Sequence, residues 1–502
     1  MTQPTNLGDL IDRSLDLDRT AIIDLREPAA PRRWSHREID RLAGGVARYL
    51  TSRGLARGAR VAILSLNRAE YIAAYFGIMR AGFVAAPVNV KLPRDTIDFV
   101  MRDAGVAFAF TDRAGRAMID ASMPQLDFDD DGAQGFAATV QPAEFDIVPV
   151  GPGEIGQLLY TSGSSGRPKG VPLSHAGQRW AVSIRTPGLS ADERYIIAQP
   201  LFHMNGLFSM KVLFAANASV VLMPGFDTRR YIEALSTYKV TNVVAVPTMF
   251  ARVVKETDLI QSLDFVLKSI SLASAPVTLA LIERVQAAFP HAEISLGYGT
   301  TEAGPAVFGP HPDGLPTPPL AIGVPVAGSD VKLIDGPDDN DGVLVMRNPA
   351  VMAGYLNLPE RTAKVLDNGW YYSGDVMRRD DNGFYSFVGR ADDMFVCSGE
   401  NIYPVEVEKL LENHPLVQQA AVVPLADEER GQMPVAFVVT KANAALTADD
   451  LKRFALANGP AYQHPRRIEF VADLPWAGTN KVDRQSLIAR ARALEANQGW
   501  SR

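Results

Sequence analysis

Residues 161–170 read TSGSSGRPKG and follow the apolar run LLY at residues 158–160. The stretch holds three glycines, four hydroxyl side chains and one lysine, Lys169. Glycine lets the backbone approach a ligand closely and turn its N–H groups toward it, while hydroxyls add donors and a lysine adds a positive charge. This combination predicts a loop that cradles a polyphosphate at the end of a buried strand.

Two common glycine-rich motifs do not match this stretch. A Walker loop requires glycine directly before the lysine and serine or threonine directly after it, whereas Pro168 and Gly170 flank Lys169 here. A hydrolase nucleophile elbow requires glycine two positions either side of a serine, and neither Ser164 nor Ser165 has it. A flexible serine–glycine linker is the alternative. The lysine and the strand-like run before it favour a phosphate loop.

Short apolar runs alternate with helical patterns through the first half of the chain. A helix is predicted at residues 35–55, after a serine cap, and another at residues 70–81. The predicted strands are residues 60–66, 82–89, 220–223, 241–246 and 270–272. Alternation of this kind predicts an α/β protein whose parallel sheets are covered by helices. Ligands of such sheets gather beyond the carboxyl ends of the strands.

The second half of the chain changes character twice. Strands dominate from residue 331 to residue 388, and an α/β rhythm restarts beyond a charged joint near Asp392. We therefore predict a large N-terminal domain of stacked α/β sheets, residues 1–391, and a smaller α+β C-terminal domain, residues 392–502.

Composition excludes several classes of protein. The chain has 502 residues, a net charge of −7 and one cysteine, Cys397. The acidic balance gives no general attraction to nucleic acid, and a single cysteine excludes an internal disulfide framework. Arg80 interrupts the longest apolar stretch, so no membrane span is predicted, and the N-terminus lacks the pattern of a secretory signal. We expect a cytoplasmic protein.

Candidate site residues follow several predicted strands. His203 lies in QPLFHMNG at residues 199–206, although a histidine between Phe202 and Met204 is more often a packed core residue. Ser274, Ala275 and Pro276 follow another strand, where small residues allow a flat ring to approach or simply form a turn.

Residues 298–302 read YGTTE, namely Tyr298, Gly299, Thr300, Thr301 and Glu302. An aromatic side chain can stack on a base, hydroxyls can bind phosphate oxygens, and a carboxylate can hold a hard cation such as Mg²⁺. A helix cap with glutamate in the first turn is an equally good interpretation of this motif taken alone.

Three further segments carry charged candidates. Residues 371–375, YYSGD, place Asp375 at a strand end, where it suits the vicinal hydroxyls of a ribose or an ordinary turn. Arg390 stands beside Asp392 in GRADD, and Lys481 lies in a loop rich in glycine, asparagine and aspartate near the C-terminus. Most surface lysines are solvated, so Lys481 carries little weight by itself.

Taken together and in this order, the motifs resemble the adenylate-forming superfamily of acyl-CoA synthetases, luciferases and peptide-synthetase adenylation domains. The resemblance extends from about residue 35 to residue 487, and FHMNG looks most like the ligases related to chlorobenzoate, benzoate and coumarate CoA ligases. It implies two half-reactions: a carboxylic acid and ATP give acyl-AMP and pyrophosphate, and then coenzyme A displaces AMP.

The resemblance also implies a role for each motif. Glu302 would hold Mg²⁺, Thr301 the α-phosphate, Asp375 and Arg390 the ribose, and Lys481 the reacting carboxylate and α-phosphate oxygens. The C-terminal domain would swing about Asp392. The residues expected to bind the triphosphate are Thr161, Ser162, Gly163, Ser164, Ser165, Gly166 and Lys169. Those expected around adenine are Ser274, Ala275, Pro276 and Tyr298, and Gly299 and Thr300 are also expected to bind the nucleotide. Those expected to reach the site for thioester formation are Ser398, Gly399, Glu400 and Asn401.

The acid is expected to lie against small or apolar side chains, which suits an aromatic ring or a modest aliphatic chain. The expected lining is His203, Met204, Phe250, Ala273, Gly297, Gly299, Ala303, Gly304 and Pro305. A short dicarboxylic acid is an alternative, because Arg252 could pair with a second carboxylate. Loading of a carrier protein is another, although PLFHMNG lacks the aspartate expected in an amino-acid activator. The expected partners are thus the acid, ATP and CoA, with no nucleic acid, in a monomer or homodimer.

Two positions depart from the family pattern. Leu296 stands where glutamine or asparagine is common, so a side-chain contact to adenine would be lost or moved. Asn480 precedes Lys481 where glycine is usual, which puts recognition by lysine-modifying enzymes in doubt.

Overall fold

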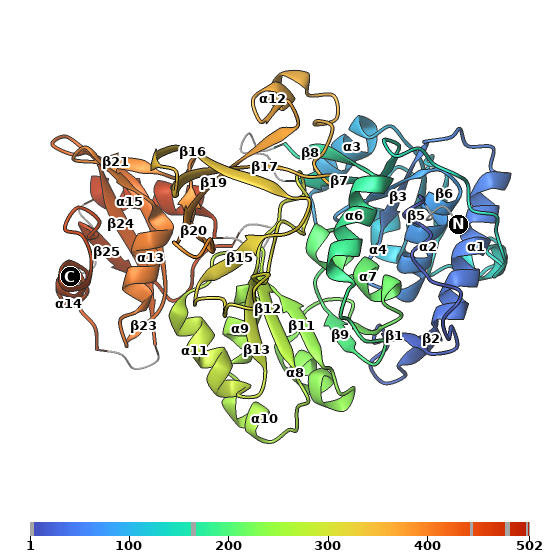
Figure 1. Ribbon diagram of the computed structural model, residues 1–502, viewed down its shortest axis with the longest axis horizontal. Coiled ribbons are helices and arrows are strands. Elements are labelled where there is room, and N and C mark those ends of the chain that lie inside the picture. Colours follow the sequence, from blue (N-terminus) through green and yellow to red (C-terminus); the bar gives the residue numbers. More distant parts are fainter. Residues whose placement is uncertain (1–4, 162–166, 442–444, 477–481, 498–499, 501–502) are drawn as a thin grey trace.

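The computed structural model describes residues 5–161, 167–441, 445–476, 482–497 and 500. Its elements form four sheets and their covering helices, in a large N-terminal domain and a smaller C-terminal domain (Figure 1). Ser162, Gly163, Ser164, Ser165, Gly166 and Lys481 lie outside the described residues.

The first sheet has the order β6-β5-β3-β4-β7-β8 and is parallel except for its last strand. β7 and β8 flank the predicted phosphate loop. The strand bounds are Arg60–Leu64 for β3, Val84–Pro87 for β4, Val106–Thr111 for β5, Gln125–Asp127 for β6, Ile155–Thr161 for β7 and Lys169–Ser174 for β8.

The second sheet has the order β13-β12-β11-β9-β10-β1-β2 and is parallel except for β2 at its edge. The strand bounds are Thr20–Asp24 for β1, Arg32–Ser35 for β2, Arg194–Ile197 for β9, Ser219–Leu222 for β10, Asn242–Ala245 for β11, Ser269–Ala273 for β12 and Glu293–Gly297 for β13. The parallel sheets that the alternation of strands and helices predicts are therefore present.

Helices pack between these two sheets and on their outer faces. One apolar core joins α1, α2, α6 and α7 to both sheets, and a second lies between the second sheet and helices α8 to α11. The bounds are His36–Ser52 for α1, Ala69–Arg80 for α2, Arg94–Asp103 for α3, Arg113–Ala117 for α4, Phe136–Thr139 for α5, His175–Arg185 for α6, Met204–Ala215 for α7, Thr228–Thr237 for α8, Pro247–Val253 for α9, Thr257–Gln261 for α10 and Leu279–Ala288 for α11.

Local sequence explains where α1 begins. The backbone N–H of Glu38 donates to Ser35 Oγ at 3.1 Å, and the N–H of Ser35 donates to Glu38 Oε2 at 2.7 Å. This reciprocal capping satisfies two donors that a helix start otherwise leaves free.

The third sheet, β14-β15-β20-β19-β17-β16, is antiparallel and lies between the α/β layers and the C-terminal domain (Figure 1). The strand bounds are Phe308–Gly309 for β14, Ala321–Pro325 for β15, Asp330–Asp338 for β16, Asp341–Arg347 for β17, Trp370–Arg379 for β19 and Tyr385–Arg390 for β20. A short strand, β18 (Leu366–Asp367), pairs with β19, and helix α12 spans Pro359–Ala363.

The C-terminal domain has a sheet of its own, β22-β21-β24-β23, on which β25 pairs in parallel with β24. Its two apolar clusters contain residues from Phe395 onward. The strand bounds are Phe395–Cys397 for β21, Glu400–Ile402 for β22, Val417–Asp427 for β23, Gly431–Thr440 for β24 and Arg467–Phe470 for β25. The helix bounds are Pro404–Glu412 for α13, Ala448–Asn458 for α14 and Arg484–Ala496 for α15.

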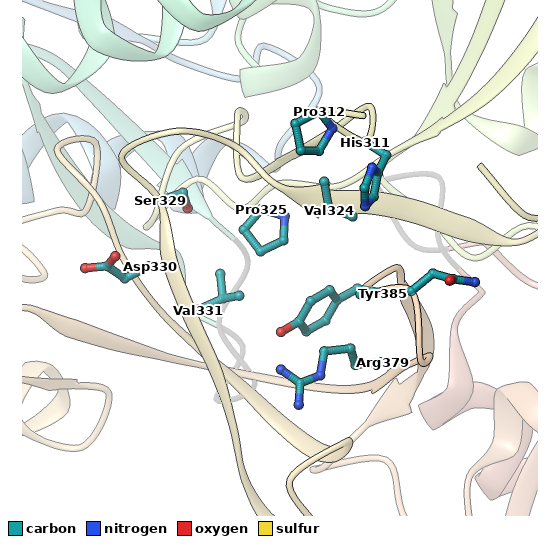
Figure 2. A pocket seen from close by; sticks show the side chains of 11 residues that line it. His311, Pro312, Val324, Pro325, Ser329, Asp330, Val331, Arg379 and Tyr385 are labelled. Atoms are coloured by element: carbon teal, nitrogen blue, oxygen red, sulfur yellow. The ribbon is translucent and has the colours of Figure 1, made fainter. Parts of the chain in front are cut away.

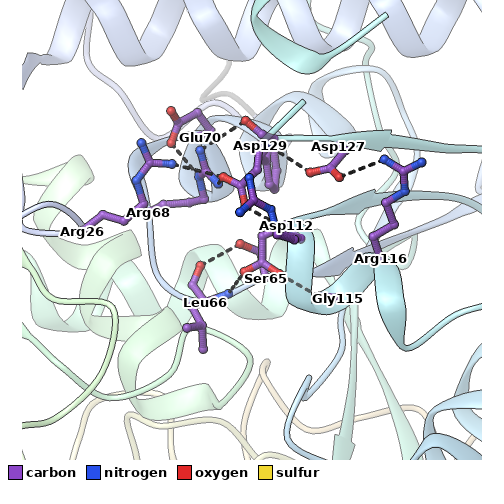
Figure 3. A network of polar contacts seen from close by, with 12 residues as sticks. Arg26, Ser65, Leu66, Arg68, Glu70, Asp112, Gly115, Arg116, Asp127 and Asp129 are labelled. Atoms are coloured by element: carbon purple, nitrogen blue, oxygen red, sulfur yellow. Dashed lines mark hydrogen bonds and ion pairs between the residues drawn. The ribbon is translucent and has the colours of Figure 1, made fainter. Parts of the chain in front are cut away.

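An ion-pair network covers the carboxyl ends of β3, β5 and β6 (Figure 3). Arg68, whose side chain is 4% exposed, donates to Glu70 at 2.9 Å and to Asp129 at 2.6 Å. Asp112 accepts from the backbone of Leu66 at 2.8 Å and of Gly115 at 2.7 Å. These acids have partners within the fold, which leaves the other strand ends to carry the candidate site.

Candidate active site

The phosphate-loop candidates lie at the carboxyl end of β7. Thr161 pairs with Lys169 across the β7–β8 ladder, so these two strands hold both ends of the loop. Thr161 Oγ1 is buried and has no hydrogen-bond partner among the described residues. A hydroxyl in this state is suited to a ligand oxygen, because a buried polar group without a partner is costly.

Lys169 is joined to Glu302 through Tyr355. Lys169 Nζ donates to the Tyr355 hydroxyl at 3.2 Å and lies 4.4 Å from the centre of its ring, and that hydroxyl donates to Glu302 Oε1 at 3.0 Å. Burial lowers the pKa of Lys169, and the carboxylate of Glu302 opposes this shift. Tyr355 was not among the predicted site residues, because its only local signal is an aromatic residue after Gly354.

Residues 300–304 form a tight turn. The Thr300 N–H donates to the Gly304 carbonyl at 3.2 Å, and Thr300 Oγ1 accepts from the Ala303 N–H at 2.9 Å. Gly304 has φ +84°, and a side chain at Gly299 would come within 2.5 Å of Pro305 Cα. The alternative interpretation of YGTTE as a helix start is therefore wrong. Its carboxylate, Glu302, is buried, while Thr301 is only partly covered.

Tyr298, Asp375 and Arg390 form one cluster. The Tyr298 hydroxyl donates to Asp375 Oδ2 at 2.5 Å, and Arg390 Nη1 donates to Asp375 Oδ1 at 2.9 Å. Gly374 has φ +72°, and a Cβ at this position would lie 3.0 Å from Arg390 Nη2. The glycine of YYSGD thus gives the arginine room beside the aspartate. The edge of the Tyr298 ring packs on Phe308.

Arg390 also binds the predicted hinge residue. Its Nε donates to Asp392 Oδ1 at 2.9 Å and its Nη2 to Asp392 Oδ2 at 3.2 Å. One guanidinium therefore joins the end of the third sheet to the first residues of the predicted C-terminal domain.

The ends of β12 and β13 form the wall proposed for the acid. Ala273 pairs with Gly297, and a Cβ at Gly297 would lie 3.0 Å from Ala273 Cβ. Ser274, at φ +73°, accepts a hydrogen bond from Asn205 Nδ2 at 2.9 Å, which ties the end of β12 to the first turn of α7. Ala275 is partly covered and Pro276 exposed on the segment that follows.

His203 occupies the N-cap position of α7, and its ring packs edge-on against Phe202 at 4.8 Å. Burial, with Lys91 acting in the same direction, lowers the pKa of His203 to about 4, so its imidazole is neutral at pH 7. Met204 is buried on the same turn. Phe250 lies fully inside the second apolar core, where it packs against Phe289 at 6.1 Å.

The predicted thioester segment lies apart from these groups. Ser398, Gly399, Glu400 and Asn401 are exposed on the β21–β22 hairpin, and Ser398 has φ +54°. Figure 1 shows β21 on the side of the C-terminal domain away from β7 and β8. In this orientation the hairpin does not meet the phosphate-loop strands.

A cavity of about 530 Å³ opens between β15, β16 and the turn after β19 (Figure 2). His311, Arg379 and Tyr385 are among the residues that line it. The described residues of the predicted site do not line this cavity, so the cavity is distinct from the cluster around Glu302 and Asp375.

The part of the chain that the structure describes has neither a metal-binding cluster nor a membrane-spanning helix. Within it, no cluster of three or more histidine, cysteine, aspartate or glutamate side chains is arranged to hold a metal ion. None of its helices combines the length and the apolar character needed to cross a membrane.

Comparison with known proteins agrees with this geometry. Residues 14–356 match the AMP-binding enzyme family, and residues 406–481 match the AMP-binding enzyme C-terminal domain. A feruloyl-CoA synthase from Amycolatopsis is 32% identical over 89% of this chain and 92% of its own length. A fatty acid–[acyl-carrier-protein] ligase from Streptomyces coeruleorubidus is 31% identical, with 92% and 93% covered.

Among solved structures, an anthranilate CoA ligase in complex with anthranoyl-AMP superposes with a TM-score of 0.89 at 27% identity, covering 98% of both chains. Family matches, fold and the order of the motifs agree along nearly the whole chain. The chain belongs to the AMP-binding enzyme family, as an AMP-forming acyl-CoA ligase.

Proposed function

We propose that this ligase activates an aromatic carboxylic acid. The observation that carries the proposal is the pairing of Ala273 with Gly297, which leaves a wall of small residues at the ends of β12 and β13. The α7 turn that begins after His203 is tied to this wall by the hydrogen bond from Asn205 to Ser274. Flat, mostly apolar walls suit an aromatic ring. Feruloyl-CoA synthase and anthranilate CoA ligase, whose names refer to aromatic acids, support the same choice.

ATP would lie across the strand ends. Thr161 and Lys169, with the loop Ser162 to Gly166, would bind the β- and γ-phosphates, and Thr301 the α-phosphate. Asp375 and Arg390 would hold the ribose, and the Tyr298–Asp375 hydrogen bond would keep the carboxylate aimed while the tyrosine ring meets adenine. Ser274, Ala275, Pro276, Gly299 and Thr300 would complete the nucleotide site.

Glu302 is the residue proposed to hold Mg²⁺. A single buried carboxylate fits this ion, which is commonly bound by one or two carboxylates together with substrate phosphates and water. Its neighbour Tyr355 uses only Oε1 in the contact described above. The ion would offset phosphate charge when bound.

The first half-reaction joins two anions, so the chain must supply positive charge and orientation. A carboxylate oxygen attacks the α-phosphorus, the bond to the bridging oxygen breaks, and pyrophosphate leaves. Lys169 would attend the leaving pyrophosphate and Lys481 the reacting oxygens. In the second step the CoA sulfur attacks the acyl carbon and AMP leaves.

One small domain would serve both steps. We place its boundary at residue 392, because the clusters from Phe395 onward form a separate core and Arg390 pairs with Asp392 at the joint. Rotation about Asp392 would withdraw Lys481 and bring Ser398 to Asn401 toward the acyl-adenylate. A cytoplasmic location, where ATP and CoA are available, is part of this proposal.

The dicarboxylate alternative has less support. Arg252 is exposed on α9, whereas Phe250 on the same helix is fully buried. A guanidinium that remains in solvent is poorly placed to hold a second carboxylate inside an acid pocket. Transfer to a carrier protein is favoured by one observation, the similarity to the carrier-protein ligase.

A panel of benzoic, cinnamic, short aliphatic and dicarboxylic acids, each supplied with ATP, Mg²⁺ and CoA, tests the proposal. Pyrophosphate release and thiol consumption are followed together. Aromatic acids should give equal amounts of both. Pyrophosphate without thiol loss would favour carrier loading, and preference for a dicarboxylic acid would reject the aromatic assignment.

A further inference from the structure

Lys211 is a buried cation that the proposed chemistry does not use. It lies on α7, its side chain is 0% exposed, and its Nζ donates to Gln178 Oε1 at 2.7 Å and to Gln157 Oε1 at 3.3 Å. Tyr75 of α2 donates to the same Gln157 oxygen, and Gln157 Nε2 donates to Gln178 Oε1 at 3.3 Å. This hydrogen-bonded network thus joins α2, α6, α7 and β7.

This arrangement is costly for packing alone. Among the described residues no carboxylate forms an ion pair or hydrogen bond with Lys211, and burial lowers its pKa to about 7. An apolar side chain of similar volume commonly stabilises a fold more than a buried charge does. Packing alone therefore does not explain why a lysine, and not an apolar residue, occupies position 211.

The network joins two elements, α7 and β7, that border proposed site residues. Lys211 shares one face of α7 with Met204 and Phe208, at helical spacings of seven and three residues, and α7 begins directly after His203. Its partner Gln157 is on β7, four residues before Thr161.

Side chains alternate between the two faces of β7, so those of Gln157 and Thr161 lie on the same face. Gln157, Leu159 and Thr161 point to one side of the sheet, and Leu159 belongs to the core that contains α7. Leu158 belongs to a different cluster, against which Tyr160 packs on the opposite side. A displacement of Gln157 would therefore be transmitted along a short strand to Thr161.

We infer that Lys211 is a positioning residue: its hydrogen bond to Gln157 holds β7 against α7 and thereby places Thr161, at the end of β7, for ATP. The inference deepens the proposed function, because it assigns a support to the proposed ATP site. It concerns ATP binding, which is measurable without acid or CoA, so its failure and that of the aromatic-acid proposal are distinguishable.

The test compares ATP binding, with Mg²⁺ present, by calorimetry in matched variants of the full chain. Lys211→Met and Gln157→Leu each should raise the Kd for ATP five- to tenfold. The double variant should bind no more weakly than the weaker single variant, because both changes break one connection. Gln178→Leu removes the other amide partner of Lys211 and an acceptor of Gln157 but keeps the Lys211–Gln157 hydrogen bond, so it should raise the Kd for ATP less than threefold.

Thermal unfolding supplies the second readout. Lys211→Met should melt at a higher temperature than the parent protein while binding ATP more weakly, a combination that loss of packing does not produce. An unchanged Kd in Lys211→Met would overturn the inference. Equal weakening in Gln157→Leu and Gln178→Leu would also overturn it, and this comparison remains decisive if Lys211→Met does not fold.

Discussion

The hydroxyl of Tyr298 donates to Oδ2 of Asp375 at 2.5 Å, which links the segment after β13 to β19 across 77 positions of sequence. Asp375 receives Arg390 on its other oxygen. The proposed adenine and ribose contacts are therefore one hydrogen-bonded unit, and changes to either residue should affect nucleotide binding together.

Tyr298→Phe should raise the KM for ATP about tenfold, because a hydrogen bond to a charged group contributes roughly 1.5–3 kcal/mol. The KM for the acid should change little. Steady-state kinetics at saturating CoA measure both, with Tyr238→Phe, beyond the end of α8, as the control. An equal increase in the KM for ATP and the KM for the acid would contradict a specific role of Tyr298 in nucleotide binding.

Glu302→Gln should lower the rate of acyl-AMP formation by about a hundredfold or more, since removal of one preorganised charge partner commonly costs this much. The variant should also need more Mg²⁺ for half-maximal rate. Pyrophosphate release over a magnesium titration checks both effects. An unchanged magnesium requirement would argue that another group holds the ion.

Lys481→Ala should abolish adenylation and leave thioester formation from supplied acyl-AMP largely intact. The physical reason is that only the first step brings two anions together. Pyrophosphate release and CoA consumption are assayed separately. Equal loss of both activities would contradict the assigned role.

Asp392→Pro should impair one half-reaction at least tenfold more than the other, because proline restricts φ at the proposed hinge. The variant also loses the two hydrogen bonds from Arg390. The same two assays measure the ratio. If both rates stay normal, the hinge lies at another residue.

Glu412 should make the contact between the domains sensitive to pH. Burial raises the pKa of Glu412 to about 7, although the Ala420 N–H, the Thr278 hydroxyl and Arg284 favour its charged form. The folded protein therefore binds more protons than the unfolded chain between about pH 4.5 and 7, and stability falls as pH rises through this window.

Glu412→Gln should remove the loss of folding stability that occurs as the pH rises from about 4.5 to 7. The variant should gain on the order of 2 kcal/mol at pH 8, less than the full shift would give because the side chain is only partly buried. At pH 4.5 it should match the parent protein. Calorimetric unfolding at the two pH values tests this, with the exposed Glu428→Gln as the control; an equal gain at both would refute a titration of Glu412.

Local patterns in the sequence predicted much of the fold. The capped helix from residue 36 and the helix Ala448–Asn458 were predictable because their caps and apolar spacing lie within a few residues. Strands β3, β4, β10, β11 and β12 were predicted to within a few residues, since each is a short apolar run with turn residues beside it, whereas β1, β2, β5 and β6 were not predicted. The motifs that begin at Thr161 and Tyr298 predicted a nucleotide site, which stays a prediction.

The tertiary structure alone decided which distant groups meet. Tyr355 joins Lys169 to Glu302 from 186 positions away, and Lys211 reaches Gln157 from another layer of the protein. Neither contact has a local signature, because both depend on how sheets and helices pack. The sequence by itself therefore determined the helices, most of the strands and the reactive residue types at the strand ends. Tertiary packing decided which distant side chains, such as Tyr355 and Lys211, contact and position those residues.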